Sequence, residues 1–294
     1  MACYPYHLVN VFAESFFAGN PLCVFTDARG MDASTMQALA FQFNLAETVF
    51  VIPQADGRLQ TRVFTPTLEM PFAGHPAIGC AHVMRACVDP ACDTVTLSFA
   101  AGDVVLEASG DAWSFSPPGL ATLKHRPSIY DATATAAMLG LANEDITETP
   151  VWIDSGNEQL VVILNSPDAL RRATLDPLRF GVWEASVIGR RVMYMVAFLP
   201  DQFDDTGRQR IAARYCSIRA DGRIGEDFGT GSACANLGAW WQLTHAGQTL
   251  RAVIEQGDAL GRPCRLLLDV TANGGVTVGG RAIALGAGQI DVPD

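Results

Sequence analysis

The spacing of hydrophobic positions along the 294 residues predicts three main helices. From Met36 onward, apolar residues recur at i, i+3, i+4 and i+7, which favours an amphipathic helix over residues 33–43. Two further helical stretches, residues 75–87 and 232–245, are rich in Ala, Gly and Cys and nearly free of charge. A helix that is apolar on most faces must be enclosed by other elements, so we expect both stretches to be central helices.

Short apolar or alternating runs predict β-strands that follow one another in groups, with one long apolar helix in each half of the chain. This order differs from the regular alternation of a doubly wound sheet and favours antiparallel sheets. The remaining patterns predict helices at 131–140, 167–172 and 206–213, and a linker over 119–127. The predicted strands span residues 6–12, 22–25, 45–52, 60–65, 94–99, 103–108, 112–116, 150–154, 159–164, 184–188, 192–199, 250–256, 264–270, 275–278 and 281–285.

A turn that carries glycine leads into each of the two central helices. In the first half, Gly74-His75-Pro76 follows a strand-like run, and the proline suits a first helical turn. Near the C-terminus, the run from Asp227 to Ser232 has a similar arrangement, with an acidic residue before a turn that contains glycine. Free N–H groups at such helix starts can hold an anion. The repeat suggests a duplicated architecture with one site between the halves, although Gly-His-Pro alone also fits a helix cap with an incidental histidine.

Composition narrows the class of protein. Hydrophobic residues make up 49% of the chain and charged residues 17%, so the chain has ample material for a buried core. The net charge of −11 argues against a nucleic-acid backbone as the main partner. No apolar run is long enough for a membrane helix, and the N-terminus lacks a secretory pattern, so we expect no membrane partner and a cytoplasmic location. The eight cysteines show no metal-ligand spacing and are expected to be reduced thiols.

Several short motifs occur in a characteristic order over nearly the whole chain. They are Gly19-Asn20-Pro21, Asn44-Leu45-Ala46-Glu47-Thr48, Phe64-Thr65-Pro66, Pro71-Phe72-Ala73-Gly74-His75-Pro76, Glu226-Asp227, Thr230-Gly231-Ser232-Ala233, Gln256-Gly257 and Gly261-Arg262-Pro263. In this order the motifs resemble those of the PhzF-like family, which is related to phenazine-biosynthesis isomerases such as trans-2,3-dihydro-3-hydroxyanthranilate isomerase.

The resemblance implies an α+β, diaminopimelate epimerase-like fold. In this fold two pseudo-symmetric lobes each wrap an antiparallel, barrel-like sheet around a central helix, and the active site lies in the cleft between them. On this basis we expect an N-terminal lobe of residues 1–118 plus 279–294 and a C-terminal lobe of residues 126–278. The resemblance also implies isomerisation without a cofactor or a metal, and a homodimer as the usual assembly.

The family's characterised isomerase uses a glutamate to shuttle a proton between ring carbons of a dihydro-hydroxyanthranilate. Carried over by motif, that glutamate is Glu47, and the accompanying polar residues are His75 and Asp227. Gly74, Gly231 and Ser232 stand at the two helix starts, where they would bind a small carboxylate substrate. Each of these assignments has a structural alternative: Glu47 could be a surface residue at a strand end, and Asp227 could cap its own turn.

The residues are compatible with this chemistry. A base that moves a proton between carbons must keep the proton and return it, and a carboxylate in an apolar cleft can do so because desolvation raises its pKa. A racemase with two catalytic thiols would need a cysteine in each turn, whereas Cys80 and Cys234 lie inside the helices.

Two points stay open in the sequence. The segment Tyr215-Cys216-Ser217 departs from the family pattern, so we expect an isomerase or epimerase whose substrate is not defined. A protein of the same fold that binds a small molecule or a protein partner without turnover is the alternative function.

Overall fold

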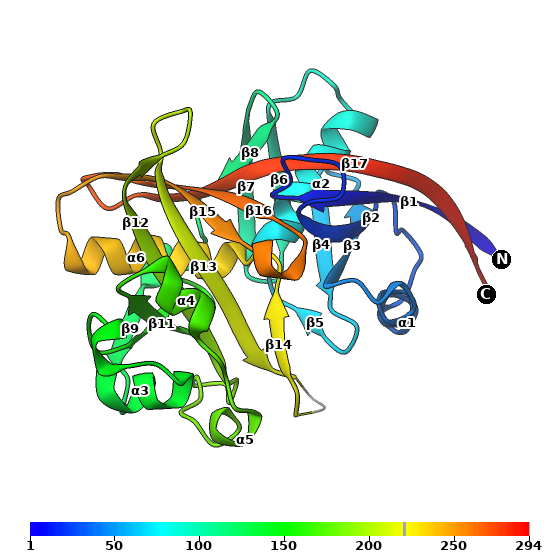
Figure 1. The fold of residues 1–294 in the computed structure, drawn as a ribbon. Coiled ribbons are helices and arrows are strands. Elements are labelled where there is room, and N and C mark those ends of the chain that lie inside the picture. The colour runs from blue at the N-terminus through cyan, green and yellow to red at the C-terminus, as the bar shows by residue number, and fades with distance from the viewer. Residues whose placement is uncertain (220–221, 294) are drawn as a thin grey trace. The chain divides into compact units, whose positions relative to one another are not determined.

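The computed structural model describes residues 1–219 and 222–293 and divides the chain into two compact units (Figure 1). The first unit comprises Met1–Pro118, Gly261–Arg265 and Gly279–Asp294, and the second comprises Gly119–Leu260 and Leu266–Val278. Strands and helices are both present, and most neighbouring strands are antiparallel, as expected for an α+β protein.

The first unit surrounds the helix α2 (Gly74–Cys87) with strands. Ten of its first eleven residues, from Gly74 to Met84, are buried, and the helix contacts β1, β2, β3, β6, β7 and β8. The other elements of this unit are β1 (Ala2–Val11), β2 (Asn20–Phe25), α1 (Ala33–Phe43), β3 (Glu47–Pro53), β4 (Leu59–Phe64), β5 (Glu69–Met70), β6 (Thr94–Phe99), β7 (Gly102–Ser109), β8 (Ala112–Phe115) and most of β17 (Val276–Val292).

A second layer of this core lies under α1. Asp32 caps the helix by accepting a hydrogen bond from the Thr35 N–H, and Asn44 ends it in the left-handed conformation. The buried rings of Phe25 and Phe50 stack at a centroid distance of 4.8 Å within the same cluster. Aromatic side chains from two strands therefore anchor the amphipathic helix predicted over 33–43.

The second unit surrounds α6 (Gly231–Thr244) in a corresponding way. All its residues from Gly231 to Trp240 except Ser232 are buried, and it contacts β10, β11 and β15. The other elements are η1 (Leu120–Thr122), β9 (Lys124–Pro127), α3 (Ala132–Leu139), η2 (Asn143–Asp145), β10 (Val151–Asp154), β11 (Gln159–Leu164), α4 (Pro167–Arg172), α5 (Pro177–Phe180), β12 (Val192–Phe203), β13 (Gln209–Ile218), β14 (Ile224–Asp227), β15 (Leu250–Gln256), η3 (Asp258–Leu260) and β16 (Cys264–Val270), whose first two residues belong to the first unit.

The structure overturns three of the sequence expectations. The helix expected over 206–213 is wrong, because this region leads into β13, whose burial alternates along the strand and whose backbone pairs with β12. The expected linker contains β9, which pairs with β10. The strand expected over 184–188 is absent: this stretch runs as loop and turn, in which the Ser186 N–H donates to the Arg190 carbonyl.

The segment Gly261–Arg265 belongs to the first unit, whereas the sequence placed it in the second lobe. The Arg262 guanidinium donates to the Gly19 carbonyl at 2.9 Å and to Asn10 Oδ1 at 2.7 Å. The Gly19 N–H in turn donates to the Pro263 carbonyl at 2.9 Å. Because these bonds join segments more than 240 residues apart, sequence order alone does not reveal them.

We predict that Gly19→Ala destabilises the protein more than Gly57→Ala. Both glycines have positive φ, +83° and +85°, so each alanine carries a left-handed backbone cost of about 1–2 kcal/mol. A Cβ on Gly19 would lie 2.6 Å from the Val11 carbonyl oxygen, whereas a Cβ on Gly57 would meet nothing within 4 Å. The Gly19 variant should lose at least about 1 kcal/mol more in urea unfolding, and equal losses would contradict the close approach.

Candidate active site

Glu47 occupies the first position of β3, beside β2. Asn44, with φ of 51°, ends α1 and turns the chain toward the strand. β3 then pairs in parallel with β2, with Glu47 opposite Leu22. The sequence placed Glu47 at this helix-to-strand junction, and the structure has it there.

The Glu47 carboxylate lies beside the imidazole of His75, with 3.5 Å between Oε2 and Nδ1. The two side chains are 19% and 6% exposed. Burial lowers the pKa of His75 to about 3, against the opposing effect of a hydrogen bond to the Pro21 backbone. The imidazole is therefore neutral near neutral pH, and the contact is between a carboxyl group and a dipole rather than between two charges.

The helix starts at the two glycine turns lack side-chain caps. Asp32, Asp131 and Ser166 each cap a helix by accepting a hydrogen bond from a backbone N–H. No such bond is present at Ala73, before α2, or at Thr230, before α6. The N–H groups of the first turn, including those of Gly74 and Gly231, are therefore not occupied by a capping side chain.

Asp227 ends β14 and contacts the turn that leads into α6. Its Oδ2 accepts a hydrogen bond from the Thr230 hydroxyl at 2.6 Å. The side chain of Gln256 binds the same turn: its Nε2 donates to the Asp227 carbonyl and to Thr230 Oγ1, both at 3.0 Å. Asp227 therefore bonds a hydroxyl of its own turn and is held by a neighbouring strand.

Ser232 is supported by polar side chains that the sequence analysis missed. Its Oγ accepts hydrogen bonds from Gln159 Nε2 at 2.9 Å and from Asn157 Nδ2 at 3.5 Å. Both oxygen lone pairs are thereby engaged, which leaves the hydroxyl hydrogen to donate. Asn236, one turn further along α6, donates to Gln159 Oε1 at 2.8 Å and accepts from the Ser155 N–H and hydroxyl. The signal in the sequence is that Asn236 is the one polar residue in the apolar stretch 233–241 of this helix.

The cysteines of the central helices are core residues, as expected. Cys80 and Cys234 are fully buried, and burial raises the pKa of the Cys80 thiol to about 12 and that of Cys234 further. Two such thiols cannot serve as a pair of catalytic thiolates. Glu226, which lies in one of the family motifs, forms a bidentate contact with Arg214, and Glu69 forms one with Arg62.

Two kinds of feature, a metal site and a membrane-spanning helix, are absent from the described residues. Residues 1–219 and 222–293 contain no group of three or more His, Cys, Asp or Glu side chains placed to hold a metal ion. Within the same ranges, the helices are too short or too polar to cross a membrane.

Comparison with known proteins identifies relatives along the whole chain. A protein of Pasteurella multocida, named as an uncharacterized isomerase, is 37% identical over 99% of this chain and 95% of its own length. Over 29% of this chain and 31% of its own length, the trans-2,3-dihydro-3-hydroxyanthranilate isomerase of Pseudomonas aeruginosa is 42% identical. Among solved structures, a phenazine biosynthesis protein of the PhzF family from Bacillus anthracis has a TM-score of 0.83 at 19% identity and covers 99% of this chain and 100% of its own.

These similarities establish the fold, the class of enzyme and the family of the chain. A central helix enclosed by largely antiparallel strands in each unit is the diaminopimelate epimerase-like α+β fold, and the protein is an enzyme of the isomerase and epimerase class. The family model for phenazine biosynthesis-like proteins, PhzC-PhzF, matches residues 9–288. The chain therefore belongs to the PhzF family.

We predict that His75 makes the stability of the protein depend on pH. Its pKa is about 3 in the folded protein, whereas an unfolded histidine has a pKa of about 6.5. Between these values the unfolded state binds a proton that the folded state does not. The free energy of unfolding should therefore fall as the pH drops below about 6.5, by up to about 1.4 kcal/mol per pH unit from this group.

The contribution of His75 is isolated by comparing urea unfolding of the wild type, His75→Gln and His125→Gln at several pH values. The His75 variant should have a shallower slope below about pH 6.5. His125 is exposed, and its variant should keep the wild-type slope. Equal slopes for all three proteins would contradict the burial of a neutral His75.

We also predict that Asn236→Ala destabilises the second unit. The substitution removes the amide that satisfies Gln159 Oε1 and the carbonyls of Ile153 and Asn157. Unsatisfied buried polar groups should reduce the free energy of unfolding by about 2–4 kcal/mol. The exposed Asn273→Ala is the control, with an expected change within about 0.5 kcal/mol; similar losses in both variants would rule out the network as the cause.

Proposed function

We propose that the protein moves a proton between carbons of a small carboxylate substrate, without a cofactor, and that Glu47 is the general acid and base. The observation that carries this proposal is the pair formed by Glu47 and the buried, neutral His75, 3.5 Å apart. A carboxyl group that is 19% exposed can contact a substrate while remaining largely shielded from water.

The neutral state of His75 matters for this chemistry. A neutral imidazole that donates its N–H to the Pro21 backbone keeps a lone pair on its other ring nitrogen. Nε2 is the ring nitrogen without a hydrogen-bond partner among the described residues, so Nδ1, which faces Glu47, is the donor and the lone pair lies on Nε2. The neutral ring can therefore accept a hydrogen bond only at Nε2, and it supplies no positive charge beside Glu47. A base next to a dipole retains its affinity for protons better than one next to a cation, as a proton shuttle requires.

The uncapped helix starts support a role in carboxylate binding. The N–H groups at Gly74 and Gly231 carry the positive end of a helix dipole, and the Ser232 hydroxyl has its hydrogen left to donate. In this proposal each helix start can bind a carboxylate group, and Asp227 orients a polar group of the substrate. That both helix starts serve the same substrate, and that the active enzyme is a homodimer, remain predictions from the family resemblance.

The relatives suggest which substrates to test first. A dihydro-hydroxyanthranilate is the substrate in the name of one isomerase relative, which aligns with less than a third of this chain. It is therefore the first compound of a panel of small amino and hydroxy acids. A family member that binds such compounds without turnover is the alternative, and the experiment below separates the two.

We predict that Glu47→Gln abolishes turnover while the protein stays folded. The assay follows both product formation and the incorporation of solvent deuterium across the substrate panel in heavy water. A base that exchanges its proton with solvent labels the carbon it reprotonates, and a base that retains the proton still converts substrate to product. The loss should be at least about 100-fold, in line with a typical contribution of general acid–base catalysis. Glu107→Gln, an exposed residue of β7, is the matched control and should label at the wild-type rate.

Urea unfolding of the same proteins checks that Glu47→Gln leaves the fold intact. Wild-type labelling by the Glu47 variant would remove Glu47 from the mechanism. If the wild type and both variants bind a panel compound but none converts it or incorporates deuterium, the non-catalytic alternative holds.

A further inference from the structure

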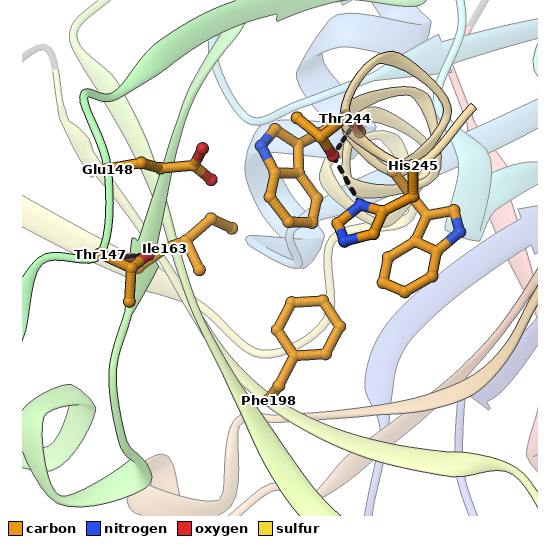
Figure 2. Close-up of a pocket in the computed structure, with 8 residues that line it drawn as sticks. Thr147, Glu148, Ile163, Phe198, Thr244 and His245 are labelled. Atoms are coloured by element: carbon orange, nitrogen blue, oxygen red, sulfur yellow. Dashed lines mark hydrogen bonds between the residues drawn. The ribbon is translucent and has the colours of Figure 1, made fainter. Parts of the chain in front are cut away.

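A pocket of about 400 Å³ opens at the end of α6 that is remote from Ser232. Its lining residues all belong to the second unit and come from four segments (Figure 2). With a rise of 1.5 Å per residue, the 12 positions from Ser232 to Thr244 span roughly 18 Å, so this pocket is separate from the helix start discussed above. The lining consists of Thr147, Glu148, Ile163, Phe198, Trp240, Trp241, Thr244 and His245.

Aromatic rings form much of the wall. The Phe198 ring lies 5.9 Å from the ring centroids of both Trp240 and Trp241. The imidazole of His245 stacks on Trp241 at 3.9 Å with an interplanar angle of 6°. The Thr244 hydroxyl donates to the Trp240 carbonyl and lies 2.8 Å from His245 Nδ1, which fixes the imidazole against the indole. The aromatic wall is therefore held in place before any ligand arrives.

A single acidic side chain faces these rings. Figure 2 shows the Glu148 carboxylate on one side of the hollow, with Phe198 and His245 on the other side. Glu148 is half-buried, and burial raises its pKa against the opposing effects of a Trp240 hydrogen bond and of His245. Among the described lining residues none is Lys or Arg, and Glu148 forms no ion pair with either type in the described part of the chain.

We propose that this pocket binds a small organic cation of the alkylammonium type. A cation over aromatic faces gains about 0.5–2 kcal/mol, and a carboxylate across the same hollow adds a Coulombic attraction that grows as water is excluded. An anion would be repelled by the carboxylate, and a neutral apolar ligand would remove water from the carboxylate without adding a partner for its charge. The volume lies within the range of about 300–1,000 Å³ typical of small-molecule sites.

Choline is the probe, and 3,3-dimethylbutan-1-ol is its neutral counterpart of almost the same shape. Binding is followed by tryptophan fluorescence and by saturation-transfer NMR of the probe's methyl groups, with sodium chloride added to equal ionic strength. Choline should give a saturable response, and the alcohol should bind at least about tenfold more weakly, which corresponds to about 1.4 kcal/mol.

Two variants test the two parts of the site. Glu148→Gln removes the charge and should weaken choline binding at least about tenfold, whereas Glu144→Gln, an exposed acid four residues earlier that does not line the pocket, should leave it unchanged. Trp241→Leu keeps the carboxylate and removes an aromatic face, and should weaken choline more than the alcohol. Equal affinities for choline and the alcohol, unchanged choline affinity in Glu148→Gln, or no saturable response to choline would each overturn the proposal.

Discussion

The structure depends on the enclosure of two helices that have too few charges to face water. α2 and α6 each bury nearly every residue of their first ten positions. A helix of this kind gains stability only when apolar surface covers it on several sides, since burial contributes about 25 cal/mol per Å². Strands, most of them in antiparallel pairs, supply that cover around one central helix in each unit.

The same burial determines the protonation states and hydrogen bonds of the polar groups near the helix starts. In an apolar interior a polar atom must find a partner or give up its charge. His75 is neutral, whereas Gln159 and Asn157 donate to the Ser232 oxygen, and Asn236 holds Gln159 in place. The surrounding core thus sets the protonation state of His75 and the orientation of the Ser232 hydroxyl, two of the groups proposed for catalysis and binding.

The sequence revealed the fold where local signals were strong. The central helices and the capped α1 were predicted from periodicity, and the motif order identified the family before any contact was known. Local signals were misleading at residues 206–213, where a helix is predicted but β13 begins. No local signal predicts the contact of Gln159 with Asn236, which lies 77 positions away. The same holds for the contact of Arg262 with Asn10, 252 positions away. Contacts of this range arise from strand pairing and tertiary packing, which a single sequence does not encode locally.

The pairing of β1 with β17 has a consequence for how the protein is made. Ala2 lies opposite Val292, so β1 pairs with a strand that is synthesised much later. Until β17 has been made, β1 can pair with β2 on one side while its other edge stays open, and an open edge is a template for pairing with other chains. Loop closure over nearly the whole chain also slows folding. β17 therefore covers the open edge of β1 in the first unit, and a chain that lacks β17 would be prone to aggregation through that edge.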